Sequence, residues 1–135
     1  MTSNNYHLDT AYIAGLFDGE GSLTYKKYKE KKKNGTYNCW RISMEIAMTD
    51  QNVIELVHET LMVGTVRPKK VPKGNKKQWR WRCTFRDCLH VCKLLWPFAN
   101  VKLHQIEKVI DHYEPSIQDL NDKVIDLALE RELRK

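Results

Sequence analysis

Two segments of this chain alternate between apolar and polar residues, and this alternation limits the folds open to it. Every second residue from Trp40 to Met48 is apolar, and Trp79, Trp81, Cys83 and Phe85 share one side of a second segment. Successive side chains of a β-strand point to opposite faces, so each segment is predicted to be a strand with one apolar and one polar face. An antiparallel sheet of such strands needs helices on its apolar face and leaves its polar face to a ligand.

Capping, turn and helix-breaking residues predict the other elements. A first helix is expected to be capped by Asp9 or Thr10, and a second by Thr49 or Asp50 with its end at Gly64. Further helices are expected over 87–96 and 101–113, and strands over 22–29, 40–48, 65–71 and 78–85, with Pro68 placing the third at an edge. The order αββαββα predicts an α+β fold with a four-stranded antiparallel, saddle-like sheet and helices on one face. Residues 1–115 are predicted to form the core of one domain, and 116–135 a helical tail of the same domain.

The charge of +6 is unevenly distributed along the chain. Residues 24–41 carry seven basic side chains and one acid, and residues 67–86 carry nine basic side chains and no acid. The formal charges of these two segments sum to +15, whereas those of the rest of the chain sum to −9. Such segregation predicts one strongly positive surface, for which nucleic acid is the commonest ligand.

The first helix ends in Ile13-Ala14-Gly15-Leu16-Phe17-Asp18-Gly19-Glu20-Gly21. This nonapeptide, followed by Ser22 and a strand, resembles the motif of the LAGLIDADG homing endonucleases, and the resemblance covers about residues 8–113. It implies a homodimeric, site-specific double-strand DNA endonuclease. Small residues along the helix would let two copies pack closely. The expected contacts are Ala11, Ala14, Gly15 and Asp18, and Asp18 is also expected to be structural near the helix end.

The resemblance also implies the residues of the catalytic site. Glu20, with the carbonyl of Gly19, is expected to bind Mg²⁺, two or three ions per dimer, for phosphodiester hydrolysis. Lys102 falls at the place of a lysine that would polarise the attacked phosphate. The resemblance also implies a polar residue near the end of the second strand that orders solvent, but Ala47 and Met48 stand there. Gln51 is a candidate to replace it, and the identity of the solvent-ordering residue stays open.

The polar side of the predicted sheet gives the expected DNA contacts. Arginine and glutamine side chains on a β-ribbon can read base edges in the major groove, while lysine-rich loops hold phosphates. The expected contact residues are Thr24, Lys26, Tyr28, Arg41, Ser43, Glu45, Arg67, Lys69, Gln78, Arg80, Arg82 and Thr84. Strand lengths, taken for two copies, predict a target of about 18–22 base pairs of double-stranded DNA.

Other features exclude or leave open further functions. No apolar run approaches the about 18 residues that span a membrane, so no membrane partner is expected. Four cysteines without a secretory signal indicate an intracellular, reducing compartment, and without a CxxC pair we expect no zinc. Two alternatives to the endonuclease stay open, an RNA-binding intron maturase and a DNA-binding regulator of the same fold without catalysis.

Overall fold

The computed structural model describes residues 3–115, with side chains from residue 8 onward. The predicted tail, residues 116–135, lies outside the described residues. The elements are α1 (Ser3–Glu20), β1 (Gly21–Lys32), β2 (Gly35–Met48), α2 (Gln51–Leu61), β3 (Thr65–Lys69), β4 (Gln78–Thr84), α3 (Arg86–Leu95) and α4 (Leu103–Tyr113). The predicted α+β class and element order are therefore confirmed. No helix in this part of the chain is long and apolar enough to cross a membrane.

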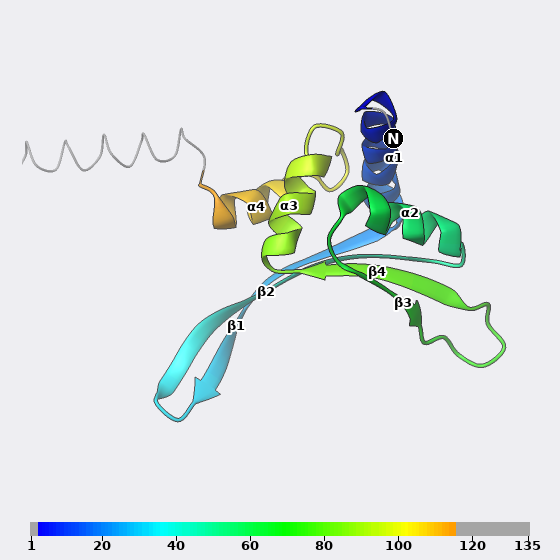
Figure 1. Ribbon diagram of the computed structural model, residues 1–135. Coiled ribbons are helices and arrows are strands. Elements are labelled where there is room, and N and C mark those ends of the chain that lie inside the picture. Colours follow the sequence, from blue (N-terminus) through cyan, green and yellow to red (C-terminus); the bar gives the residue numbers. More distant parts are fainter. Residues whose placement is uncertain (1–2, 116–135) are drawn as a thin grey trace, which may run out of the picture.

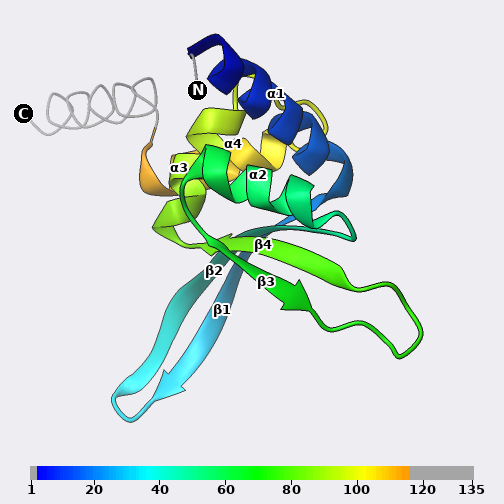
Figure 2. The same cartoon turned by 45° about the vertical axis from the view of Figure 1, so that its right-hand side comes forward.

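The four strands form one antiparallel sheet in the order β1-β2-β4-β3. The helices gather over one face of this sheet, and the β1–β2 and β3–β4 hairpins diverge beyond them (Figures 1 and 2). β3, which contains Pro68, lies at an edge as predicted, where proline interrupts the fewest ladder hydrogen bonds. Lys33 and Asn34 form the turn between β1 and β2.

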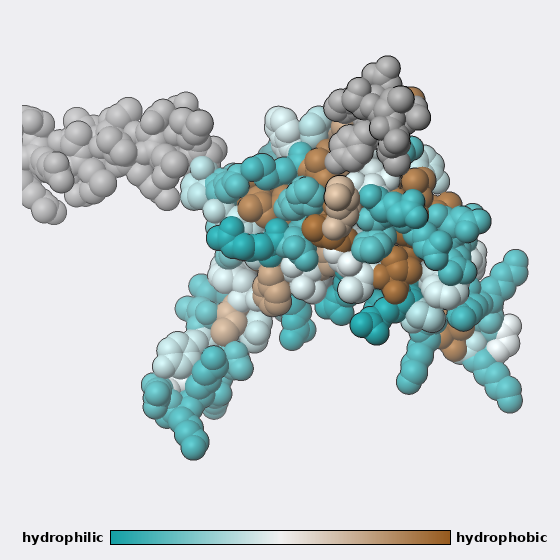
Figure 3. Space-filling model, viewed as in Figure 1, coloured by the Kyte–Doolittle hydropathy of each residue, from teal (hydrophilic) through white to brown (hydrophobic). Residues whose placement is uncertain are grey.

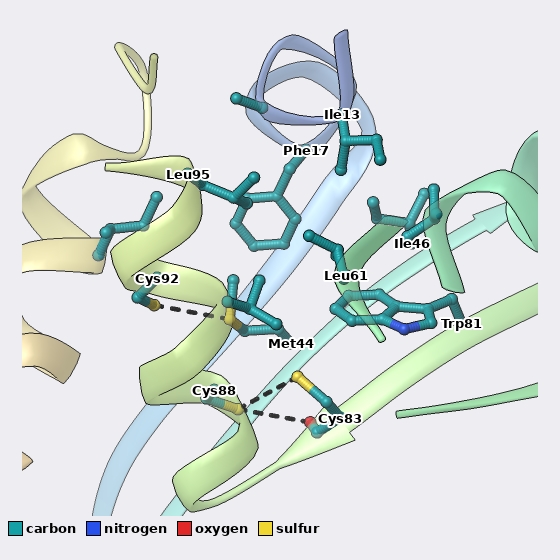
Figure 4. Packing of buried hydrophobic residues seen from close by; sticks show 14 of the residues in the cluster. Ile13, Phe17, Met44, Ile46, Leu61, Trp81, Cys83, Cys88, Cys92 and Leu95 are labelled. Carbon is teal, nitrogen blue, oxygen red and sulfur yellow. Dashed lines mark hydrogen bonds between the residues drawn. The ribbon is translucent and has the colours of Figure 1, made fainter. Parts of the chain in front are cut away.

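The core lies between the apolar face of the sheet and the four helices. Ile42, Met44 and Ile46 of β2 are at most 1% exposed, which confirms the predicted alternation. Trp81 of β4 is fully buried and donates its indole N–H to the carbonyl of Val63 at 2.9 Å, so the polar atom of this large side chain is satisfied. Figure 4 shows Met44, Ile46 and Trp81 packed against Ile13, Phe17, Leu61 and Leu95 from three helices.

Three local predictions are corrected by the structure. Phe85 ends the strand with a φ of 52° and is 54% exposed, because the chain turns there into α3. α2 ends at Met62 in the left-handed conformation, not at Gly64, although its cap at Asp50 is as predicted. α1 begins six residues before Asp9, and Thr10 is 2% exposed inside the helix, so neither residue caps it.

The β1–β2 hairpin is supported beyond the core by an aromatic cluster. Tyr25 and Trp40 stack across the two strands with their ring centroids 4.8 Å apart. The His112 ring of α4 packs edge-on against both, and its Nδ1 lies 3.2 Å from the Tyr25 hydroxyl. The cluster connects the part of the β1–β2 hairpin nearest the core to α4.

Gly64 provides a test of how tightly the loop after α2 packs. Its φ is +90°, and a Cβ built there would lie 2.7 Å from the Arg82 carbonyl oxygen. Gly64→Ala is expected to lower the free energy of unfolding by about 3 kcal/mol, from backbone strain and overpacking together. Gly74→Ala is the matched control, because Gly74 has a φ of +94° but open space around it, and it should cost only about 1 kcal/mol. Urea unfolding followed by tryptophan fluorescence measures both, and equal losses would contradict the packing argument.

Candidate nucleic-acid interface and catalytic site

The face of the sheet away from the helices, here called the open face, carries all twelve predicted DNA contacts. Its rows follow from the strand register: Ser22, Glu45, Arg82 and Thr65 form one row, and Thr24, Ser43 and Thr84 the next. Lys26 is paired with Arg41, and Tyr28 lies beside this pair, with the Arg41 guanidinium 5.4 Å from its ring centroid. On the other side follow Ala47 with Arg80 and Arg67, and then Gln78 with Lys69. The expected residues therefore share one surface.

The outer parts of both hairpins carry further lysines, on both faces of the β1–β2 ribbon. Lys29 and Lys31–Lys33 lie at the end of the first hairpin, and Lys70, Lys73, Lys76 and Lys77 follow β3, all of them exposed. In the space-filling view both protruding arms are covered mainly by hydrophilic side chains (Figure 3). Exposed ammonium groups on flexible stems suit phosphate contacts, whereas arginine and glutamine on a rigid strand suit base edges.

Glu20 is the last residue of α1, and its side chain is exposed. The Glu20 carboxylate makes no hydrogen bond or ion pair with any residue that the structure describes. The next residue, Gly21, opens β1 and pairs with Ile46 near the end of β2. A Cβ at Gly21 would overlap the Phe17 ring and lie 2.8 Å from the Phe17 carbonyl oxygen, so this close approach requires glycine. The packing of Phe17 on Gly21 therefore fixes where the Glu20 carboxylate leaves the helix.

Lys102 lies beside the same end of α1, although it is far away in the sequence. Its ammonium group donates to the Asp18 carbonyl at 2.7 Å, within two residues of Glu20. The Asp18 carboxylate in turn accepts the backbone N–H groups of Asn100 at 2.8 Å and Lys102 at 3.1 Å. Asn100 and Lys102 lie in the short segment directly before the first residue of α4, so Asp18 fastens the segment that enters α4 to the end of α1.

Gln51 does not join this group. It is the first residue of α2, and its side-chain amide donates to Glu55 at 3.0 Å on the same helix. No hydrogen bond among the described residues connects it to Glu20 or Lys102. At the end of β2, the position where a polar residue was expected, Ala47 is paired with Arg80 of the neighbouring strand. Arg80 is therefore the polar residue beside that position, and only the strand register could have identified it.

The exposed side of α1 differs in part from the predicted dimer contacts. Ala14 is 1% exposed and belongs to the core, and Asp18 is engaged by the start of α4. Gly15 is exposed, with open space around it, and Ala11 is half-buried. The same side exposes two apolar residues that were not predicted, Leu8 at 69% and Tyr12 at 52%. Tyr12 lies about one helical turn and Leu8 about two turns before Gly15, and this spacing could have placed them on the same side of the helix. The correction is that Ala14 packs inward, while Leu8 and Tyr12 supply the apolar outer side.

Three cysteines lie together in the core. The Sγ atoms of Cys83 and Cys88 are 3.6 Å apart, and Cys92 donates to the sulfur of Met44 (Figure 4). The hydrogen bond with Cys88, together with burial, raises the pKa of Cys83, and burial raises the pKa of Cys92. These two thiols therefore stay protonated at neutral pH. Within residues 3–115 no group of three or more His, Cys, Asp or Glu side chains could hold a metal ion.

Comparison with known proteins identifies the class. The LAGLIDADG endonuclease profile matches residues 13–104, more than half of the chain, and the protein belongs to the LAGLIDADG endonuclease family. The predicted family resemblance is thereby confirmed. Comparison with curated proteins found no significant match.

Solved structures of homing endonucleases share the fold. I-CvuI, in complex with its target in the presence of 2 mM Ca, has a TM-score of 0.66 and 20% identity over 81% of this chain and 68% of that chain. The archaeal intron-encoded I-Vdi141I, in complex with DNA, has a TM-score of 0.59 and 19% identity over 76% of this chain and 64% of that chain. The group I intron-encoded I-CeuI, also in complex with DNA, has a TM-score of 0.56 and 19% identity over 82% and 52%. The chain thus spans about half to two thirds of the length of these enzymes.

Asp18 gives a test of the connection between α1 and α4. Asp18→Ala removes the acceptor of two backbone N–H groups, and it should lower the free energy of unfolding by about 2 kcal/mol. Asp18→Asn keeps the shape and one side-chain oxygen, so its loss should be clearly smaller. Chemical denaturation of the three proteins measures the difference. An alanine variant as stable as the original would show that these hydrogen bonds do not hold the two helix ends together.

Proposed function

We propose that this protein is a homodimeric, Mg²⁺-dependent endonuclease that cuts both strands of a long pseudo-palindromic DNA site. The observation that carries the proposal is the place of Glu20, an exposed carboxylate at the end of α1 and directly before the strand that begins the open face. Family membership and the DNA complexes of I-CvuI, I-Vdi141I and I-CeuI support it.

The open face would lie along the major groove of the target. A groove about 12 Å wide admits a two-stranded β-ribbon, and each base pair presents its own pattern of donors and acceptors there. Arg80, Arg82 and Gln78 are on β4 with side chains of the types that read guanine and adenine. Two copies would then cover about 18–22 base pairs, if each strand rises about 3.3 Å per residue.

The second copy would pack against the exposed side of α1. Leu8, Tyr12 and Gly15 recur there at helical spacing, and Gly15 lets two helix backbones approach closely. An isologous contact along this helix would bring the two Glu20 residues near one twofold axis. One site for each DNA strand would then arise from a chain with a single motif.

The oxygen donors at the end of α1 fit Mg²⁺, which prefers carboxylate, carbonyl and water ligands. Glu20 and the Gly19 carbonyl would hold the ion together with the scissile phosphate and the second copy, since the described part of one chain lacks a complete cluster. When bound, Mg²⁺ supplies charge stabilisation for an in-line displacement at phosphorus. Lys102 would place its ammonium charge beside the attacked phosphate, because it is held at the same helix end.

A cleavage assay on a randomised duplex library tests the proposal. The expected result is enrichment of one pseudo-palindromic sequence, cut with Mg²⁺ and left intact with Ca²⁺ or EDTA. Binding without any cutting would contradict an endonuclease and favour a regulator of the same fold. Selection of an intron RNA over all duplexes would favour a maturase.

Glu20→Gln is expected to abolish cleavage of the selected site, because the neutral amide no longer binds the metal strongly. Affinity for the DNA should stay within about threefold, a difference of at most about 0.7 kcal/mol in binding free energy. Glu59→Gln on the exposed side of α2 is the matched control for loss of one negative charge, and it should cut normally. Cleavage by Glu20→Gln at the original rate would remove Glu20 from the mechanism.

Gly15→Leu tests the dimer. A Cβ at Gly15 meets nothing within 4 Å in its own chain, and leucine replaces a poor helix former, so the fold should be retained. Close approach of two helices would be blocked, however. Light scattering should give about twice the chain mass of 16.0 kDa for the original protein and a single chain mass for the variant. Asn52→Leu, an exposed change on α2, should stay dimeric, and a Gly15→Leu dimer would contradict the α1 interface.

A further inference from the structure

Glu45 is an acid in the middle of a surface whose other residues are mostly neutral or basic. It lies on β2 between Ser22 and Arg82, its direct partners on the neighbouring strands. Among the strand residues of the open face, Glu30 is the one other acid, and it lies far out on the β1–β2 hairpin. A carboxylate that faces a phosphate-rich ligand weakens binding unless it meets a specific donor.

The protein itself does not neutralise Glu45. Arg82 is its cross-strand partner, but no ion pair joins the two, and the one salt bridge among the described residues connects Lys93 with Glu114. Arg82 lines a hollow of about 350 Å³ with Thr65, Thr84 and Asp87, a set that does not include Glu45. The half-buried Glu45 side chain is therefore left with its acceptor oxygens free on the open face.

Base edges in the major groove present few donors that a carboxylate could accept. Cytosine offers its N4 amino group, and adenine offers its N6 amino group beside an N7 acceptor that repels a carboxylate. We propose that Glu45 accepts a hydrogen bond from the N4 amino group of a cytosine and selects a C·G base pair in each half-site. The inference rests on the proposed DNA-binding function and adds a specific base to it.

The fold also gives the position of that base pair. Glu45 is paired with Ser22, two residues beyond Glu20, so it lies at the inner end of the hairpin near α1. Glu30 is paired with Tyr37, eight residues away along β2. With about 3.3 Å per residue and about 3.4 Å per base pair, the two acids lie over positions about eight base pairs apart. The selected cytosine should therefore fall in the inner part of the half-site, close to the scissile phosphates.

Binding selection from a randomised duplex library in Ca²⁺ tests the proposal with three proteins: the original, Glu45→Gln and Glu30→Gln. The original should require cytosine at one inner position of each half-site. In Glu45→Gln the preference for cytosine at this position should fall by about tenfold and shift toward adenine, which glutamine binds through N6 and N7. The base preferences at all other positions should be unchanged. Glu30→Gln removes the same charge at the outer end, so it should keep the original base preferences.

A modified duplex provides a second measurement that does not depend on how well a variant folds. The cytosine at the selected position is replaced by its analogue without the exocyclic amino group. The original protein should bind this duplex about tenfold more weakly, whereas Glu45→Gln should bind both duplexes with similar affinity. An equal loss for both proteins would overturn the proposed contact.

Two further outcomes would also overturn it. Uniformly tighter binding by both glutamine variants, with unchanged base preferences, would make Glu45 a charge that only repels phosphates. An unchanged binding profile for Glu45→Gln with loss of cleavage in Mg²⁺ would assign Glu45 to the metal. Failure of the original protein to enrich any sequence would instead reject the proposed function, and the inference with it.

Discussion

The carboxylate of Asp18 connects the two segments on which the candidate site depends. It accepts the backbone N–H groups at the start of α4, while Lys102 returns a hydrogen bond to the Asp18 carbonyl. The C-terminal end of a helix carries partial negative charge, so an ammonium group on its last carbonyls is stabilising. The same contacts place a cation within two residues of Glu20. One set of hydrogen bonds therefore both stabilises this region and holds Lys102 close to Glu20.

Much of the fold could be predicted because its signals are local. The alternation in β2 and β4 and the cap at Asp50 each depend on a few neighbouring residues. The errors at Phe85 and Gly64 arose where tertiary packing decides the backbone. Phe85 turns outward because its backbone takes a φ of 52° as the chain enters α3, although its N–H still bonds to the Ile42 carbonyl. Gly64 is needed against Trp81 and the Arg82 carbonyl, not for a helix end.

The sequence predicted which residues belong to the open face of the candidate site, but not which of them lie next to one another. Alternation alone assigns side chains to a face, which is why the open-face residues were found. It does not show that Ala47 is paired with Arg80, because strand register depends on the order of strands in the sheet. Nor could the small residues of α1 be divided into inner and outer ones, since Ala14 is buried by α1 packing on the rest of the chain. Gln51 was proposed from sequence proximity to the end of β2, and its side chain bonds within α2 instead.

The alternation within each strand also separates the residues that determine stability from the residues that determine the open face. Residues that hold the core and residues that face a ligand occupy every second position of the same short segments, as in Ile42, Ser43, Met44 and Glu45. A substitution at an odd-numbered residue of β2 changes the open face and leaves the core packing on the other face in place. Binding preference can therefore drift through single replacements while stability is preserved. Such a sheet suits a protein whose target changes over evolutionary time while its fold does not.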